Sequence, residues 1–319
     1  MTIRNRLAAA LIGASAIVAP LGAQATEFIN ILTGGTSGVY YPMGVALSKI
    51  YSEAVPNSRV QVQSTKASVE NLNLLQQGRG EIGFSLGDSV KLAVEGDAEA
   101  GFPVPLDKLR GIAGIYPNYI QIVASKESGI ATLDDLRGKS VSVGAPKSGT
   151  ELNARAILEA AGMSYDDLGR VEYLPFAESV ELMKNRQLDA TLQSAGLGVA
   201  SLKDLSTAIP ISVVAIPAEI AETLGAPYVA SEIPAETYSG QNENVATVAV
   251  INYLVSSDAV SDDTAYAMTK SLFENLNEMR AAHSAAEAID PQNALVGMPV
   301  PVHPGAQRYY DEIGVKADE

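Results

Sequence analysis

The stretch "TGGTSGVYYPMG" at residues 33–44 places glycines and hydroxyl side chains directly before an apolar, periodic segment. Three kinds of chemistry use such a junction. A glycine-rich loop can cradle a nucleotide phosphate, an exposed serine can attack a carbonyl, and a helix start can offer unpaired N–H groups to a small anion. The rest of the sequence has to distinguish between them.

Serine hydrolysis is the enzymatic alternative, with Ser37 as its nucleophile. The stretch lacks the GxSxG spacing of a hydrolase elbow, and the two histidines, His283 and His303, stand in polar or proline-flanked context. The chain contains no cysteine and no HExxH motif, which excludes thiolate chemistry and disfavours a histidine-based metal site. We therefore expect no catalytic residue and no metal, and keep a Ser37 hydrolase as the rival of another class.

Nucleotide binding is disfavoured by a second glycine-rich turn, "GAPKSGTE" at 144–151. Its glycines have Walker spacing, but Thr150 stands where the lysine belongs and Lys147 is misplaced. The Rossmann GxGxxG pattern is also missing. We expect no cofactor, and an amide-lined anion site remains the best interpretation.

Strands and helices alternate along the chain in two similar series. In the first series, apolar patterns predict strands at 27–35, 59–66 and 81–88 and helices over 39–50, from 68 and at 89–94. In the second, they predict a strand, a glycine-rich turn and the start of a helix over 139–151, a helix at 177–185 and strands at 189–196 and 208–216. Two long β-rich runs stand apart, at 109–125 (broken at Pro117) and 245–257. Helices are also expected at 264–280 and 305–314.

This order predicts an α/β protein of two lobes, with two β-sheets flanked by helices and a hinge of two strands. Lobe I would hold residues 27–114 plus 250–319, and lobe II residues 118–245. The hinge strands would lie at about 111–124 and 245–255. A protein of this kind closes on a ligand between its lobes.

The ligand should lie where strand ends lead into helices, since helix N-termini carry unpaired N–H groups and partial positive charge. Four turns qualify, at 33–41, 64–68, 85–89 and 144–151. The candidate ligand-binding residues are those of the turns, a phenol at the lobe crossing and the end of one second-lobe strand: Thr36, Ser37, Tyr40, Ser64, Lys66, Ala67, Ser85, Asp88, Tyr116, Ser148, Gly149, Thr150, Gln193 and Ala195.

Some of these residues have a purely structural alternative. Ser37 and Ser68 could be helix N-caps, and Ser148 with Glu151 matches a capping box. Lys66 stands at a predicted strand end in a chain poor in basic residues, where it either pairs with a ligand carboxylate or is solvated.

The N-terminal 25 residues predict a signal peptide. Arg4 and Arg6 precede an apolar stretch at 7–19, and Ala23-Gln24-Ala25 fits a cleavage site, so the mature chain would start at Thr26. Removing the two arginines takes the formal charge from −15 to −17, which disfavours nucleic acid and anionic membranes as partners. No later apolar run is long enough to span a bilayer, so we expect a soluble periplasmic protein.

Several motifs together resemble the TAXI family of TRAP-transporter solute receptors: "LTGGTSGVYYPMG", "STKASVENLNLLQ", "FSLGDS", "SVSVGAPKSGTELNA", "ETYSGQNENVATVAVINYLV" and "MPVPVHPGAQRYY". The resemblance covers nearly the whole mature chain in order. It implies a type II periplasmic-binding-protein fold, capture of small organic acids or amino acids (glutamate, glutamine or related dicarboxylates), and delivery to an integral-membrane permease driven by an ion gradient.

The resemblance carries over by motif to Thr36, Ser37 and Tyr40, to 64–68, and to 148–150. Many relatives have "STGGS" in the second turn, where this chain has "STKAS"; Lys66 therefore indicates a ligand with an additional negative group. The arginine filter of the other TRAP receptor class has no counterpart here. We expect a monomeric solute receptor, and the alternatives are a receptor for an ABC permease or for a membrane sensor kinase.

Overall fold

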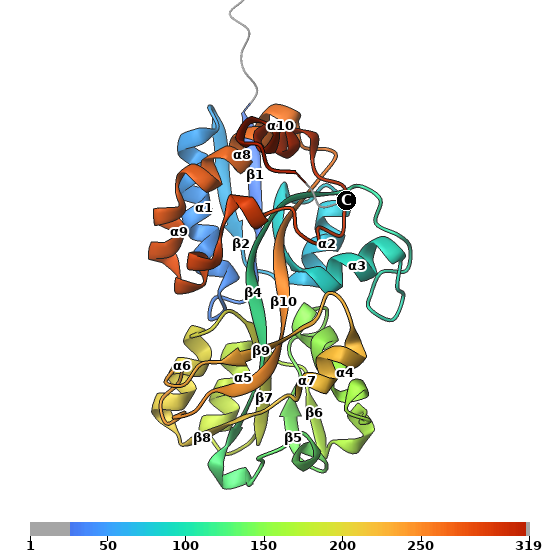
Figure 1. The fold of residues 1–319 in the computed structure, drawn as a ribbon, viewed down its shortest axis with the longest axis vertical. Helices are drawn as coiled ribbons and strands as arrows, with labels where there is room; N and C mark the ends of the chain where they lie inside the picture. The colour runs from blue at the N-terminus through green and yellow to red at the C-terminus, as the bar shows by residue number, and fades with distance from the viewer. Residues whose placement is uncertain (1–25, 317–319) are drawn as a thin grey trace, which may run out of the picture.

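The computed structural model describes residues 26–316, so the predicted signal peptide lies outside the described part. Two lobes are stacked along the long axis, and the strands β4 (Leu109–Ser125) and β10 (Val245–Ser257) run through both (Figure 1). No helix within residues 26–316 is both long and apolar enough to cross a membrane. The lobe boundaries themselves stay a prediction.

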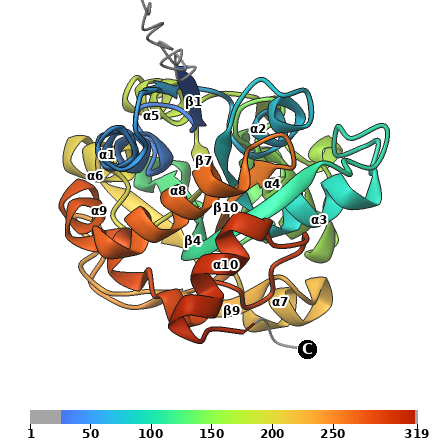
Figure 2. The same cartoon turned by 90° about the horizontal axis from the view of Figure 1, so that it is seen from above.

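The first lobe begins with three strand–helix units, as the periodicity predicts. They are β1 (Glu27–Leu32), α1 (Tyr40–Ala54), β2 (Ser58–Gln63), α2 (Ser68–Gln76), β3 (Ile82–Leu86) and α3 (Gly87–Glu95). The chain returns to this lobe after β10 with α8 (Asp262–Glu274), α9 (Leu276–Ala282) and α10 (Pro304–Ile313). Seen from above, α1, α8 and α9 lie on one side of the crossing strands and α2 and α3 on the other (Figure 2).

The second lobe is built between the two long strands. It contains β5 (Ser140–Ser142), α4 (Gly149–Ala160), β6 (Arg170–Glu172), α5 (Phe176–Lys184), β7 (Ala190–Ala195), α6 (Ala200–Ala208), β8 (Ile211–Val214), α7 (Ala218–Leu224) and β9 (Val229–Ile233). The sequence did not predict β6, α6, α7 or β9. β6, α7 and β9 are short, so their apolar patterns have too few positions to show a period. α6 is as long as α2, α3 and α5, so length does not explain why it was missed.

Hydrogen bonding joins the two expected sheets into one. Its strand order is β2-β1-β3-β10-β4-β7-β5-β6, with β8 paired to β4 and β9 to β10. The outer strands pair in parallel, β1 with β2 and β3, and β5 with β6 and β7. The sheet is continuous because β4 and β10 pair with each other, antiparallel, and each contributes to both lobes.

The expected break at Pro117 is wrong, because β4 continues through it. Pro117 stands opposite Ile251, and the register shifts between Ile251 and Tyr253 on β10. A proline cannot donate to a strand ladder and is accommodated where a bulge interrupts the pairing. The irregularity in β10 therefore lets β4 remain one strand across the lobe boundary.

The single helix expected over 264–280 is instead two, α8 and α9. Asn275 ends the first with φ −122° and ψ 33°, outside helical geometry. Its side-chain amide donates to the carbonyl of Ser271 at 2.8 Å. An asparagine side chain that bonds its own backbone competes with helix continuation, and the apolar period alone does not reveal this.

The core is not divided cleanly between the lobes. On α1, the predicted apolar stripe Met43, Leu47 and Ile50 is buried, and the same hydrophobic cluster continues to Val180 on α5 and Leu202 on α6. The lobes therefore contact each other through apolar side chains as well as through the crossing strands.

Candidate ligand-binding site

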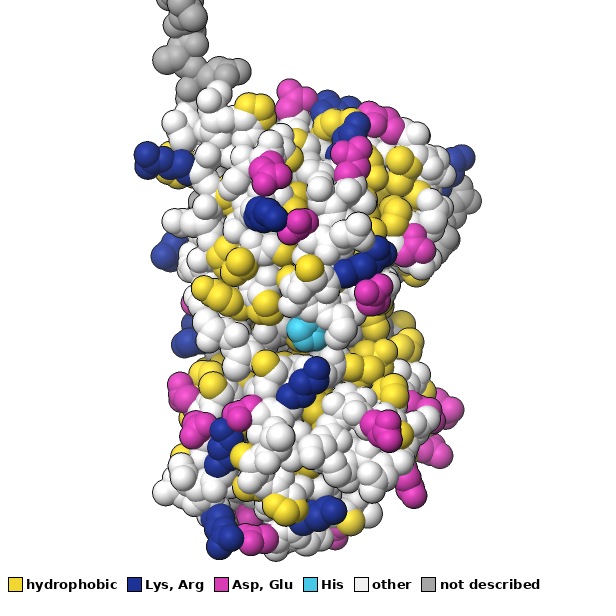
Figure 3. All heavy atoms as spheres, turned by 90° about the vertical axis from the view of Figure 1, so that its left-hand side faces the viewer, with side chains coloured by type: hydrophobic (Ala, Val, Ile, Leu, Met, Phe, Trp, Pro, Cys, Tyr) yellow, Lys and Arg dark blue, Asp and Glu magenta, His cyan; other side chains and the backbone are white. Residues whose placement is uncertain are grey.

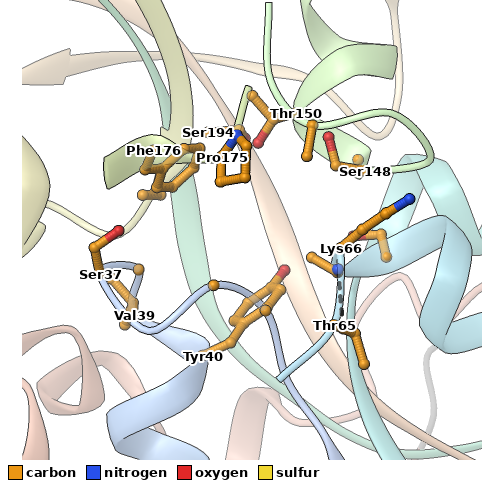
Figure 4. A pocket seen from close by; sticks show the side chains of 18 of the residues that line it. Ser37, Val39, Tyr40, Thr65, Lys66, Ser148, Thr150, Pro175, Phe176 and Ser194 are labelled. Carbon is orange, nitrogen blue, oxygen red and sulfur yellow. Dashed lines mark hydrogen bonds between the residues drawn. The ribbon is translucent and has the colours of Figure 1, made fainter. Parts of the chain in front are cut away.

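A cavity of about 330 Å³ lies between the lobes. Its wall is formed by the starts of four helices, α1 and α2 from the first lobe and α4 and α5 from the second, with β4 and β7 contributing one and two residues (Figure 4). Of the candidate residues from the sequence, it brings together Thr36, Ser37, Tyr40, Ser64, Lys66, Ala67, Ser148, Gly149, Thr150 and Ala195.

The loop before α1 forms a tight turn on one side of the cavity. The Gly38 N–H donates to the carbonyl of Gly35 at 3.0 Å, and α1 begins two residues later. Val39 is the N-cap and no side chain caps this helix, so the capping alternative for Ser37 is wrong. The Ser37 hydroxyl has no hydrogen-bond partner among residues 26–316 and lies at the cavity wall, where it is available to a ligand.

Tyr40 is the first residue of α1 and is held in place from two sides. Its phenol donates to Asn252 Oδ1 on β10, and its ring stacks on Phe84 at a centroid distance of 5.0 Å. Burial raises the pKa of the Tyr40 phenol far above its usual range. The phenol is therefore a neutral group at working pH.

The second turn is held together by side-chain hydrogen bonds. The Ser64 hydroxyl donates to the Gly34 carbonyl at 2.9 Å, and Thr65 Oγ1 accepts from the Ala67 N–H at 3.0 Å. Ala67 has φ 72° and ψ −150°, a conformation that is essentially restricted to glycine. Ser68 is not the N-cap, contrary to the capping alternative: its Oγ accepts from the Leu86 N–H at 3.2 Å instead.

Lys66 lies in the same turn and is exposed at the cavity mouth. Its backbone N–H donates to Glu70 Oε2 at 2.6 Å, while its ammonium makes no ion pair with any residue that the structure describes. Both uses considered for it, pairing with a ligand or solvation, stay open. The wall also carries Glu178, the third residue of α5.

The turn before α4 follows the predicted capping pattern only in part. Ser148 is the N-cap, and its Oγ accepts from the Glu151 N–H at 3.1 Å. The Glu151 carboxylate does not return the bond; it pairs with Arg155 at 2.8 Å and accepts from the Tyr165 phenol at 3.0 Å. The Ser148 hydroxyl thus serves the helix, and the N–H groups of Gly149 and Thr150 remain for a ligand.

The start of α5 is the part of the wall that the sequence did not predict. Pro175, Phe176, Ala177 and Glu178 all line the cavity. A Cβ placed on Gly38 would lie 3.8 Å from the Phe176 ring, so the aromatic ring faces the first-lobe loop. The available signal was the helix predicted at 177–185, whose N-terminus was not considered as a ligand site.

The crossing strands form a polar floor. Asn252 Nδ2 donates to Asn118 Oδ1 at 2.7 Å, and Asn118 Nδ2 donates to the Ser194 carbonyl at 2.9 Å. Ser194 is 5 % exposed, and its hydroxyl has no hydrogen-bond partner in the part of the chain described. Asn118 and Ser194 both line the cavity. Asn118 could have been predicted as a site residue, because it is a polar residue inside the long apolar run at 109–125.

Four candidate residues do not lie on the wall: Ser85, Asp88, Tyr116 and Gln193. Gln193 accepts from the Ser201 hydroxyl at 2.6 Å, away from its neighbour Ser194, since successive strand residues face opposite ways. Ser85 Oγ lies 3.3 Å from the Leu86 carbonyl, and the Tyr116 phenol is buried without a partner among the described residues. Asp88 faces the other lobe rather than the cavity.

Most residues of the wall are uncharged; its charged side chains are Lys66 and Glu178. The four helix starts bring N–H groups and partial positive charge to one cavity. No histidine is among the residues of the wall. Residues 26–316 contain no cluster of three or more histidine, cysteine or acidic side chains suited to a metal ion.

A protein-family model described as the NMT1-like family matches residues 31–314. Among solved structures, a protein from Bordetella bronchiseptica RB50 is 13% identical, with 90% of this chain and 98% of that chain covered and a TM-score of 0.56. A putative L-cystine ABC transporter from Listeria monocytogenes is also 13% identical, covering 83% and 98% with a TM-score of 0.52.

A third solved structure is the alkanesulfonate-binding protein from Xanthomonas axonopodis pv. citri bound to MOPS. It is 17% identical, with coverage of 81% and 74% and a TM-score of 0.48. Identities at this level establish the architecture alone. They confirm the predicted α/β type II periplasmic-binding-protein fold.

Proposed function

The chain belongs to the NMT1-like family, and from this premise we propose that it is a periplasmic solute receptor that closes on a small, carboxylate-bearing ligand. The observation that carries the proposal is the cavity between the lobes, where four helix starts from both lobes meet. Its volume of about 330 Å³ is at the lower end of the range for small-molecule sites.

The wall supports an anionic ligand in particular. Helix N-termini bind carboxylates through backbone N–H groups, and those of Gly149 and Thr150 have no intrahelical partner. The unpartnered Ser194 hydroxyl offers one further hydrogen bond from the floor. Lys66 at the mouth favours glutamate or a related dicarboxylate over a mono-amide such as glutamine.

The membrane partner follows from the resemblance to the TAXI family: an ion-gradient-driven TRAP permease. A structure titled as a putative L-cystine ABC transporter shares the fold, so an ABC permease is the alternative. Uptake by cells distinguishes the two, because collapse of the ion gradient stops the first and depletion of ATP stops the second. A membrane sensor kinase would show signalling without uptake.

Hydrolysis remains the rival of another class. Ser37 lines the cavity, but the wall holds no histidine that could serve as its base. A hydrolase would lose turnover on Ser37→Ala, whereas a receptor has no turnover to lose.

A thermal-shift screen of the mature chain against organic acids and amino acids tests the proposal. A ligand at 100 times its Kd stabilises the folded state by about 2.7 kcal/mol. The chain has no tryptophan, so detection should use a dye or calorimetry. Ser194→Ala should reduce the shift given by the best acid, while Ser85→Ala, an equally buried serine outside the wall, should preserve it. No stabilisation by any small acid would contradict the proposal.

A further inference from the structure

Asp88 joins the two lobes through hydrogen bonds of its carboxylate. It is the second residue of α3 in the first lobe and is 3 % exposed. One oxygen, Oδ2, accepts from Asn153 Nδ2 at 2.6 Å and from the Tyr228 phenol at 2.7 Å. Asn153 is on α4 and Tyr228 directly precedes β9, so both donors come from the second lobe.

Two other contacts near Asp88 also join the lobes. The Glu70 N–H on α2 donates to the Lys147 carbonyl at 3.2 Å. A Cβ built on Gly149 at the start of α4 would lie 2.6 Å from Ser68 Oγ. Bending at β4 and β10 would separate these pairs and expose Asp88 to water, because its donors move away with the second lobe.

The buried carboxylate is not balanced by a cation. Asp88 has no ion pair within residues 26–316, and its other oxygen, Oδ1, has no hydrogen-bond partner there. Lys91, on the same helix, is exposed. On α4, Arg155 pairs with Glu151 at 2.8 Å and extends its other nitrogen to the Glu99 carbonyl at 3.4 Å.

The titratable groups that face Asp88 from the other elements are two phenols, Tyr40 of α1 and Tyr228. Burial raises the pKa of both far above the usual range, so neither carries charge near neutral pH. Burial also raises the pKa of Asp88 above its usual value. The hydrogen bonds from Tyr228 and Asn153 and the backbone N–H groups of Ser89 and Asp88 at the start of α3 have smaller, opposite effects. A buried carboxylate without a cation beside it raises the free energy of the closed form, and taking up a proton removes that cost.

We propose that Asp88 is a proton-binding site formed by lobe closure, so that the receptor takes up a proton when it closes and closes more readily as pH falls. The inference rests on the proposed function for its biological meaning, since closure is the step that captures a solute. A proton then acts as a second ligand of the closed state.

The direction of the pH effect follows from the difference in proton binding between the open and closed forms. Separation of the lobes would return Asp88 to water and remove the burial that raises its pKa, so that pKa is higher in the closed form than in the open form. Between these two values the closed form binds more protons, so the closed fraction rises as pH falls through the closed-state value. A single proton changes the closed-to-open ratio by at most about tenfold per pH unit. Below the open-state value the ratio becomes constant.

Lobe closure can be measured without any solute, because the chain has no cysteine of its own. Lys91→Cys on α3 and Glu159→Cys on α4 introduce two exposed sites on opposite lobes for nitroxide labels. Pulsed electron paramagnetic resonance then gives the populations of short and long distances. We expect the short-distance population to grow as the buffer is taken from about pH 8 down to the lowest pH at which circular dichroism still shows a folded chain.

Three variants, each made in the spin-labelled double-cysteine chain, test whether Asp88 is the group that binds the proton. Asp88→Asn should make the populations independent of pH. Tyr228→Phe removes a donor to the carboxylate and should move the transition to higher pH. Glu81→Gln is the matched control: burial raises the pKa of Glu81 too, but its partner Asn30 is in the same lobe, so the pH response should persist.

Two results would overturn the inference: populations that do not change with pH in the parent chain, or a response that Asp88→Asn leaves intact. Tyr228→Phe keeps the test decisive if Asp88→Asn fails to fold. Because no solute is present, these results are independent of the thermal-shift screen, which tests the receptor function itself.

Discussion

The phenol of Tyr40, on the first helix, donates a hydrogen bond to Asn252 Oδ1 on the crossing strand β10. The Asn252 amide in turn donates to Asn118 Oδ1 on the other crossing strand, β4, at 2.7 Å. The start of α1 is thereby fixed to both strands that connect the lobes. All three side chains are buried, so each bond is protected from water.

Tyr40→Phe should lower the free energy of unfolding by about 1–3 kcal/mol, because it leaves Asn252 Oδ1 buried without its donor. Denaturant unfolding measures this difference. Tyr51→Phe is the control, since the Tyr51 phenol is equally buried but has no partner among the described residues. Its removal should cost little or stabilise the protein. Equal losses of unfolding free energy in both variants would show that the hydrogen bond from Tyr40 to Asn252 does not cause the effect.

Ala67→Gly should raise the melting temperature. At φ 72° and ψ −150° an alanine is strained by about 1–3 kcal/mol, and glycine removes that strain. Calorimetry on both proteins gives the change. Ala156→Gly, inside α4, is the control and should lower stability by about 1 kcal/mol. A destabilised Ala67→Gly would show that the alanine methyl contributes more through its contacts than its conformation costs.

Lys66→Ala should weaken binding of a dicarboxylate about tenfold and that of its mono-amide less than twofold. The expectation rests on one ammonium at the cavity mouth that has no other ion pair within residues 26–316 and that pairs with a ligand charge. Isothermal titration calorimetry on the two ligands measures the ratio. Lys91→Ala, outside the wall, should affect neither. Equal losses for both ligands would mean that Lys66 does not recognise charge.

Ser148→Ala should destabilise the fold by about 1 kcal/mol through loss of the N-cap of α4. Glu151→Gln should leave the cap intact, because the Glu151 side chain does not bond the Ser148 backbone and serves Arg155 and Tyr165 instead. Chemical denaturation measures the free energy of unfolding of both variants. A loss of that free energy in Glu151→Gln alone would show that Ser148 is not the side chain that caps α4.

The stability of the fold should fall as pH rises through the folded-state pKa of Glu81. Burial raises that pKa above the unfolded value, so the folded state holds the proton more tightly. Glu81→Gln should flatten this part of the pH–stability profile, measured by urea unfolding at several pH values. An unchanged slope would show that another group is responsible.

Local signals were sufficient to predict the elements that carry the cavity. Glycines followed by a helical period marked the turns before α1 and α4, and both turns line the cavity. Their role as ligand contacts stays a prediction. The two-lobed α/β architecture was predictable from two series of alternating strands and helices joined by two long apolar runs, whereas the type II fold was implied by the family resemblance.

The sequence did not predict which way the side chain of a residue at a strand end faces. Gln193 and Ser194 are neighbours, yet the floor of the cavity uses Ser194, because the pleat turns Gln193 toward Ser201. Asp88 follows a strand end just as predicted, but α3 points it at α4 across the lobe boundary. These outcomes depend on how the lobes are stacked, which no local pattern encodes.

The surface also departs from expectation based on net charge. The face in Figure 3 shows acidic and basic side chains interspersed, with apolar side chains gathered around the middle of the molecule. The strongly negative total charge therefore does not produce a uniformly acidic face on this side. A small anion approaching here would meet charges of both signs.

The position of β10 has a consequence for synthesis. In the sheet it lies between β3 and β4, although more than a hundred residues separate it from either in sequence. A nascent chain that has not yet reached residue 257 leaves the edge of β3 unpaired, so the N-terminal lobe stays incomplete on the ribosome. The sheet of the first lobe is therefore completed only after the whole segment that forms the second lobe has been synthesised.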